Sequence, residues 1–299
     1  MSFRVTVPCT RAQGEAIAGA DDPFTKSENP PVLVADEPDE KKPDEWLIHA
    51  YFDHHPEGME IAILTSLGCG PPQIEKLGEQ DWVTMSQTGL QPICAGRFTV
   101  HTPTHPPEPN RINFEIDAGL AFGTGQHATT SGCLAALDRL EREGAQFQNI
   151  ADIGTGTGLL AFAALALWPG AKCIAADIDP IAIDVARDNA AINCVKLGHS
   201  AGELLLAAAD GMDSPMLAAR MPFDLIVANI LAGPLIELAP DFAKSLTIGG
   251  TIILAGLLDS QTESVLSAYD RMGLKLFDRG RGEWPVLVVR GGPSTGTYS

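Results

Sequence analysis

A glycine-rich turn between an apolar strand and an apolar helix is the most informative chemical feature of this sequence. The stretch IADIGTGTGLL, residues 150–160, contains Asp152 followed by Gly154, Gly156 and Gly158. Glycines lack a Cβ atom, so they accept positive φ angles and let backbone N–H groups approach a bound carboxylate or sugar. The N-terminus of the following helix favours negative charge at the same place. The pattern therefore predicts a cradle for a small polar ligand.

A second carboxylate stands at the end of the next apolar segment. Asp177 follows Gly158 by 19 residues and ends the run CIAAD. In a parallel sheet this position lies at the edge where ligands bind, and a carboxylate there can accept two hydrogen bonds from a ribose. The turn and Asp177 together predict a bound nucleoside.

The spacing of the glycines separates two kinds of nucleoside ligand. A dinucleotide fingerprint, G-x-G-x-x-G, needs a small residue where this chain has Leu159, which weakens a pyrophosphate interpretation. The pattern D-x-G-x-G-x-G instead resembles the first motif of the seven-stranded methyltransferases, which bind S-adenosylmethionine. That ligand has no phosphate, and its ribose suits Asp177. A glycine turn that merely joins a strand to a helix in some other α/β protein is the structural alternative.

A polar residue also ends a third apolar run. In FDLIVANILAGPL, residues 223–235, Asn229 follows the apolar segment. Its amide can both accept and donate hydrogen bonds, so it could hold a cofactor and an incoming amine together. An Asn that only caps the loop is the alternative. NILA stands where enzymes that methylate planar nitrogens carry D/N-P-P-Y/F, which counts against a nucleobase or glutamine-amide acceptor.

A second glycine-rich stretch, DAGLAFGTGQHATT, covers residues 117–130 ahead of the main motif. Its composition predicts a loop able to fold over a ligand, with Thr129 or Thr130 capping the next helix and offering a hydroxyl group. For Thr130 a plain helix cap is the alternative. His127 is better explained by structural hydrogen bonds than by catalysis.

The elements that must position these residues follow from hydrophobic patterning. After residue 111 apolar strands (IADI, CIAAD, FDLIVANI, TIILAGL) alternate with helical segments, which predicts an α/β fold with a doubly wound, mostly parallel sheet. The short runs FRVTV, PPVLVAD and WLIHAYF predict a smaller α+β module of the ferredoxin-like kind. We expect a first domain over residues 1–100, a proline-rich linker over 101–110 and the second domain over 111–299.

The charge balance restricts the partners of this chain. It carries 38 acidic and 20 basic side chains, a net charge of −18, and residues 1–110 alone hold 17 acids and 7 bases. Such a field repels phosphate groups and can steer a basic protein. We therefore expect a basic protein partner and no direct recognition of nucleic acid. The alternative explanation is that the excess of acidic side chains serves only to keep the protein soluble.

The sequence shows no sign of membrane insertion or secretion. No apolar run reaches the roughly 18 residues that a membrane-spanning helix needs, and MSFRVTVPCT lacks the features of a secretory signal. We expect a cytoplasmic protein without a membrane partner. The six cysteines have no C-x-x-C spacing, which predicts idle thiols rather than a metal site.

Five segments in order resemble the bacterial ribosomal protein L11 methyltransferases over about residues 80–290: DAGLAFGTGQHATT, ADIGTGTGLLAFAAL, ADIDPIAIDVARDNAAIN, VANILAGPLIELAP and GLLDSQTESVLSAY. The resemblance implies a seven-stranded, Rossmann-like methyltransferase sheet, S-adenosylmethionine as cofactor and a substrate-recognition domain at the front. It implies lysine side chains or the N-terminal α-amine of L11 as acceptors. By this resemblance, the residues that correspond to the family's cofactor contacts are Thr130, Gly154, Asp177 and Asn229. The argument from the glycine turn adds Asp152 and Gly156.

The implied chemistry is direct displacement, in which a neutral amine attacks the methyl carbon in line with the departing sulfur. Catalysis is then chiefly orientation, and an apolar pocket helps by lowering the pKa of the amine. We hypothesise that Asn229 and nearby backbone carbonyls orient the amine lone pair. The alternatives are a methyltransferase for another protein lysine or a small molecule, an NAD-dependent oxidoreductase, and a non-catalytic ribosome-associated binding module.

Overall fold

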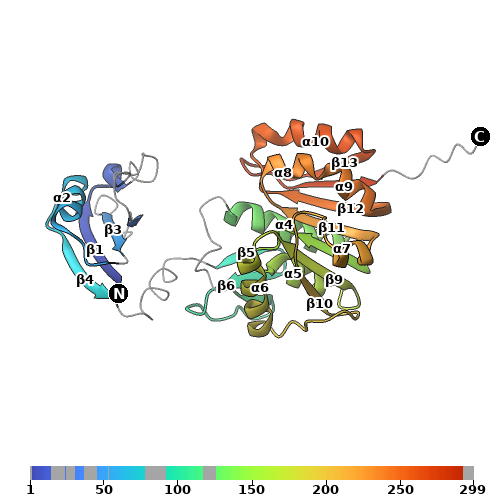
Figure 1. The fold of residues 1–299 in the computed structure, drawn as a ribbon, viewed down its shortest axis with the longest axis horizontal. Coiled ribbons are helices and arrows are strands. Elements are labelled where there is room, and N and C mark those ends of the chain that lie inside the picture. Colours follow the sequence, from blue (N-terminus) through green and yellow to red (C-terminus); the bar gives the residue numbers. More distant parts are fainter. Residues whose placement is uncertain are drawn as a thin grey trace, which may run out of the picture. The chain divides into compact units, whose positions relative to one another are not determined.

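The structure is a computed structural model that divides into two compact units, residues 1–89 and 90–299 (Figure 1). Each unit has a buried core of its own. No helix in the described part of the chain is long and apolar enough to cross a membrane. The residues that the structure describes are 2–14, 24, 31–36, 46–52, 54–77, 92–116 and 126–291.

The first unit is built on a four-stranded antiparallel sheet in the order β2-β3-β1-β4. Its elements are β1 (Ser2–Cys9), β2 (Val32–Asp36), β3 (Trp46–Phe52), α2 (Gly58–Leu67) and β4 (Gln73–Leu77). Alternation in β1 buries Val5 and Val7 against Leu64 of α2. A ferredoxin-like fold has another helix between β1 and β2, and most of that segment lies outside the described residues. The ferredoxin-like assignment therefore stays a prediction.

The larger unit contains a seven-stranded sheet in the order β10-β9-β8-β11-β12-β14-β13. Neighbouring strands from β10 to β12 are parallel, and β14 is antiparallel to both of its neighbours. This arrangement confirms the predicted mostly parallel, seven-stranded sheet. The strands are β8 (Asn149–Ile153), β9 (Lys172–Asp177), β10 (Leu204–Ala208), β11 (Phe223–Asn229), β12 (Leu246–Ala255), β13 (Leu274–Arg279) and β14 (Leu287–Gly291).

Helices cover both faces of this sheet (Figure 1). Alternate strand residues face opposite sides: Val227 packs in the same core as α4 and α5, and Ile226 packs in the core of α7 to α10. The sheet is therefore doubly wound, as predicted. The helices are α4 (Gln126–Arg142), α5 (Leu159–Leu167), α6 (Pro180–Ile192), α7 (Pro215–Arg220), α8 (Ala232–Glu237), α9 (Ala239–Ser245) and α10 (Thr262–Arg271).

One predicted helix is two helices in the structure. The segment LAGPLIELAPDFAKSL, residues 231–246, divides into α8 and α9, and Pro240 lies in the first turn of α9. Proline has no N–H group to donate and clashes with the preceding turn of a helix, so it is tolerated at a helix start but not within one. This explains why the apolar pattern continues while the helix does not.

Residues 101–110 belong to the larger unit, which differs from the predicted linker and domain boundary. They lead from β6 (Phe98–His101) to β7 (Ile112–Glu115), and these two strands pair in parallel. β5 (Ile93–Ala95) pairs with the other edge of β6 in the antiparallel direction. Phe98 and Phe114 from this small sheet lie in the same core as α4 and α5. Parallel neighbours need a crossover connection, and the proline-rich segment provides it.

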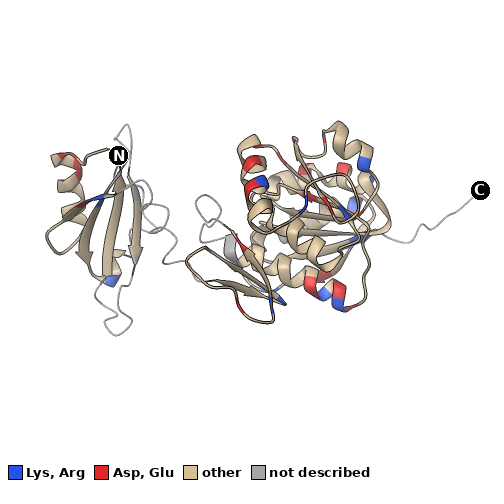
Figure 2. Cartoon of the chain, turned by 90° about the horizontal axis from the view of Figure 1, so that it is seen from below, with Lys and Arg blue, Asp and Glu red and all other residues tan. Residues whose placement is uncertain are grey.

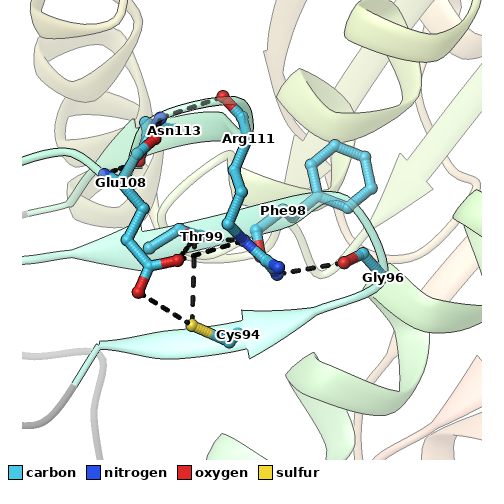
Figure 3. Close-up of polar contacts among 7 residues, drawn as sticks. All are labelled: Cys94, Gly96, Phe98, Thr99, Glu108, Arg111 and Asn113. Atoms are coloured by element: carbon cyan, nitrogen blue, oxygen red, sulfur yellow. Dashed lines mark hydrogen bonds and ion pairs between the residues drawn. The ribbon is translucent and has the colours of Figure 1, made fainter.

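Polar contacts fasten this crossover to the small sheet (Figure 3). Arg111 Nε donates to Thr99 Oγ1 at 2.7 Å, and its Nη2 donates to the Gly96 carbonyl oxygen at 3.0 Å. The Glu108 N–H donates to Asn113 Oδ1 at 2.7 Å. These contacts order the end of a segment whose composition alone predicts an irregular linker.

Candidate functional site

The glycine turn joins β8 to α5 at the carboxyl end of the parallel strands. Gly154, Gly156 and Gly158 have φ angles of +73°, +53° and +84°, all in the region that favours glycine. The Ala176 carbonyl oxygen on β9 accepts from Gly154 N at 2.8 Å and from Thr155 N at 3.0 Å. The backbone conformation predicted from the glycine spacing is therefore confirmed, and β9 holds the turn in place.

Asp177, the last residue of β9, also bonds to this turn. Its Oδ2 accepts from Gly156 N at 2.8 Å, and its Oδ1 accepts from Asp179 N at 3.1 Å. An ionised carboxylate offers about four acceptor positions, so both oxygens keep capacity for a ligand. Asp177 thus lies beside the cradle, as its position in the sequence predicts.

Asp152 supports the turn from within the fold. The residue is 1% exposed, and its Oδ2 accepts from Thr155 Oγ1 at 2.6 Å and from Ala161 N at 3.2 Å. Its Oδ1 has no hydrogen-bond partner among the described residues. Burial raises the pKa of Asp152 to about 6, although these two hydrogen bonds favour the charged form.

Asn229 ends β11 and faces α4. Its Nδ2 donates to Thr130 Oγ1 at 3.5 Å, the long end of the hydrogen-bond range. Because α4 begins at Gln126, Thr130 lies inside the helix, and the prediction that it caps the helix is wrong. The predicted ligand-covering loop falls mainly on residues 117–125, which lie outside the described part of the chain, as does the side chain of His127.

The structure brings the predicted residues together at one edge of the sheet. Strands β9, β8 and β11 are neighbours in this order, and their carboxyl ends carry Asp177, the glycine turn and Asn229. A Cβ atom added to Gly156 would meet no atom of the described residues within 4 Å. This face of the turn therefore has room for a ligand, beside a carboxylate and the N-terminus of α5.

Two asparagines that were not predicted from the sequence fasten α6: Asn189 within the helix bonds to the glycine turn, and Asn193 at its C-terminal cap bonds to β7. Asn189 is 2% exposed, and its Nδ2 donates to the Thr157 carbonyl oxygen of the turn at 3.1 Å. Asn193 donates to the Glu115 carbonyl oxygen at 2.7 Å and accepts from Glu115 N at 2.9 Å. Asparagine is a poor helix former, so Asn189 inside α6 is the signal that indicates a side-chain role.

Comparisons with known proteins agree on one family. The model of the family described as ribosomal protein L11 methyltransferase (PrmA) matches residues 7–291. A protein named ribosomal protein L11 methyltransferase from Brucella abortus (strain S19) is 46% identical over 231 residues, which cover 76% of this chain and 78% of that protein. One of the same name from Chelativorans sp. (strain BNC1) is 43% identical and covers 78% and 79%.

A solved structure supports the same comparison. The crystal structure of a ribosomal protein L11 methylase from Lactobacillus delbrueckii subsp. bulgaricus superposes with a TM-score of 0.57 at 27% identity. The match covers 68% of this chain and 98% of that one.

Proposed function

Because this chain belongs to the ribosomal protein L11 methyltransferase family, we propose that it transfers methyl groups from S-adenosylmethionine to amino groups of ribosomal protein L11. The observation that carries the proposal is the glycine turn bonded to Asp177, with Asn229 on the neighbouring strand. The acceptors are lysine side chains, the N-terminal α-amine or both. A ribosomal substrate agrees with the cytoplasmic location that the sequence predicts.

The residues of the cradle suit S-adenosylmethionine. Asp177 has acceptor capacity for the ribose hydroxyls, and the open face of Gly156 gives the ligand room. Asp152 is buried beneath the turn and contributes to cofactor binding through the turn itself, which its Oδ2 holds by accepting from Thr155 Oγ1 and Ala161 N. When bound, this cofactor supplies a methyl group on a positively charged sulfur, which an amine can attack.

Asn229 acts on the acceptor amine in this proposal. The Nδ2 group donates to Thr130 Oγ1, which fixes the orientation of the amide and leaves Oδ1 to accept from an amine N–H. Holding that N–H directs the amine lone pair toward the donor methyl group. Orientation of this kind accounts for much of the rate of a displacement reaction that needs no covalent intermediate.

The first unit is the proposed substrate-recognition domain. Residues 1–89 hold 16 acids and 6 bases, which gives a net charge of −10 and favours a basic protein. Figure 2 shows few of these charges, because only four of the 16 acids, Asp36, Glu57, Glu60 and Glu75, lie among the described residues. The proposed charge complementarity to L11 is therefore supported by the number of acidic residues in the sequence of this unit.

The decisive experiment is methyl transfer by the purified chain. The chain is incubated with isotopically labelled S-adenosylmethionine in three reactions, which contain L11, a mixture of the other ribosomal proteins, or no added protein. The products are analysed by mass spectrometry. We expect label on lysine or N-terminal amines of L11 and little elsewhere. Label on a different ribosomal protein would show that L11 is not the acceptor. The absence of label on every protein would contradict a catalytic role. A fluorescence titration with NADH tests the oxidoreductase alternative, for which we expect no binding.

A further inference from the structure

Ile230, the residue that follows Asn229, is enclosed by two glycines from the ends of neighbouring strands. On one side lies Gly154 in the turn after β8, where an added Cβ atom would stand 2.2 Å from Ile230 Cγ2. Real Cβ atoms do not approach other atoms so closely, so only glycine leaves room for this side chain. The Ile230 side chain therefore rests directly on the turn proposed to hold the cofactor.

On the other side lies Gly256, which follows β12 and has a φ angle of +86°. A Cβ atom there would stand 2.4 Å from the Ile230 carbonyl oxygen and 2.9 Å from its backbone nitrogen. Gly256 therefore meets the backbone of Ile230, whereas Gly154 meets its side chain. The Ile230 N–H donates to the Ala255 carbonyl oxygen at 3.1 Å, which fastens this peptide to the end of β12.

These contacts link the donor side of the site to the acceptor side. Asn229 pairs with Ala255 in the sheet, and the next peptide is held by Ala255 and Gly256. That peptide belongs to Ile230, whose Cγ2 atom touches the glycine turn at Gly154. A shift of the Ile230 backbone therefore moves the adjoining Asn229 relative to the turn.

We propose that Ile230, held between Gly154 and Gly256, is the positioning residue that sets Asn229 against the cofactor turn. This inference rests on the proposed function and extends it to residues that touch neither reacting group. Methyl transfer depends on in-line geometry, and misplacement by about 1 Å can lower a rate about 100-fold. Glycine at 256 is needed because a larger residue would displace the backbone next to Asn229.

The first test compares Gly256→Ala with Gly273→Ala. Gly273 has a φ angle of +79°, and within the described part of the chain a Cβ atom added there meets nothing within 4 Å. Both variants therefore carry similar backbone strain, and only Gly256→Ala presses on Ile230. We expect Gly256→Ala to lower kcat on L11 about 100-fold relative to Gly273→Ala, with a similar calorimetric Kd for S-adenosylmethionine. Hydrogen exchange of the Ile230 amide should also be faster in Gly256→Ala.

The second test is a pair of double variants with Ile230→Ala. This substitution removes Cγ2, so it should restore at least part of the S-adenosylmethionine affinity that Gly154→Ala loses. It keeps the backbone atoms, so it should not restore the kcat lost in Gly256→Ala. Ile230→Ala should therefore rescue Gly154→Ala but not Gly256→Ala, although both glycines contact the same residue.

The outcomes separate this inference from the proposed function. If the unmodified chain fails to methylate L11, the proposed function fails, while hydrogen exchange and calorimetry still test the placement of Ile230. If the unmodified chain is active and Gly256→Ala matches Gly273→Ala in kcat and in Ile230 exchange, the inference is overturned. Rescue of Gly256→Ala by Ile230→Ala would also overturn it, because that clash involves the backbone alone.

Discussion

Asp177 Oδ2 accepts a hydrogen bond from the Gly156 N–H at 2.8 Å, so the carboxylate at the end of β9 is part of the glycine turn. Its other oxygen bonds to Asp179 N, at the start of α6. Asp177 therefore organises the backbone of the glycine turn and of the start of α6 before any ligand binds. Loss of this carboxylate should affect both the shape of the site and the direct contact with a ribose.

Replacing Asp177 with alanine should weaken S-adenosylmethionine binding strongly. Hydrogen bonds to charged groups contribute about 1.5–3 kcal/mol each, so the loss of one or two corresponds to at least about a tenfold rise in Kd. Isothermal titration calorimetry measures this change. Asp184→Ala is the control, since Asp184 on α6 is exposed and, among the described residues, forms an ion pair only with Arg187. Equal affinities for the two variants would remove Asp177 from the cofactor site.

Replacing Asn229 with alanine should abolish most methyl transfer while the fold remains. Asn229 is partly exposed at a strand end, and its side chain donates one hydrogen bond among the described residues, to Thr130, so little packing is lost. We expect kcat on L11 to fall about 100-fold, as for other losses of substrate orientation, with a nearly unchanged melting temperature. Unchanged turnover would show that Asn229 does not orient the amine.

Thr130 offers a separate test of the same contact. Thr130→Val keeps the shape of the side chain but removes the hydroxyl that accepts from Asn229 Nδ2, whereas Thr130→Ser keeps the hydroxyl. We expect kcat to fall in the valine variant and to be largely retained in the serine variant. Similar kcat values in the two would mean that the hydroxyl does not fix the Asn229 amide.

Much of the larger unit could be predicted because its central strands are continuous apolar runs that end in polar residues. β8, β9 and β11 are buried along most of their lengths, and Asp177 and Asn229 mark the ends of two of them. β13 lies at the edge of the sheet with mostly exposed residues, so its sequence LKLFDR has no clear pattern. Burial on both faces produces the signal that an edge strand lacks.

The remaining differences concern contacts between residues far apart in the sequence. Proline content indicates that residues 102–110 form neither helix nor strand, but it does not indicate that β6 and β7 pair within one unit. The bond between Asp177 and Gly156 depends on the register of β8 and β9. The close approach of Gly256 to Ile230 requires β11 and β12 to be neighbours. Local patterns do not contain this information.

The buried Asp152 should make stability depend on pH. Burial raises its pKa from 3.8 to about 6, so the folded chain keeps the proton where the unfolded chain releases it. The free energy of unfolding should therefore fall as pH rises from about 4 to about 6 and stay lower above that. A rise from 3.8 to about 6 corresponds to roughly 3 kcal/mol.

Asp152→Asn should remove this part of the pH dependence. An amide oxygen can still accept from Thr155 and Ala161, so the variant keeps the hydrogen bonds that the carboxylate makes. Urea unfolding of both proteins between pH 4 and 7 measures the difference. We expect the variant to gain stability relative to the original chain as pH rises. A difference that does not change with pH would show that Asp152 titrates normally.

Replacing Asn189 with alanine should loosen the glycine turn from α6. The Thr157 carbonyl oxygen would lose its hydrogen bond from a side chain that is 2% exposed, at a cost of about 1–3 kcal/mol. Alanine is the better helix former, so a net loss in urea unfolding must come from the missing contact. Calorimetry should show weaker S-adenosylmethionine binding, because Thr157 lies in the turn. Asp188→Ala, at an exposed position of α6, should change neither property, and an equally unaffected Asn189→Ala would show that α6 does not support the turn.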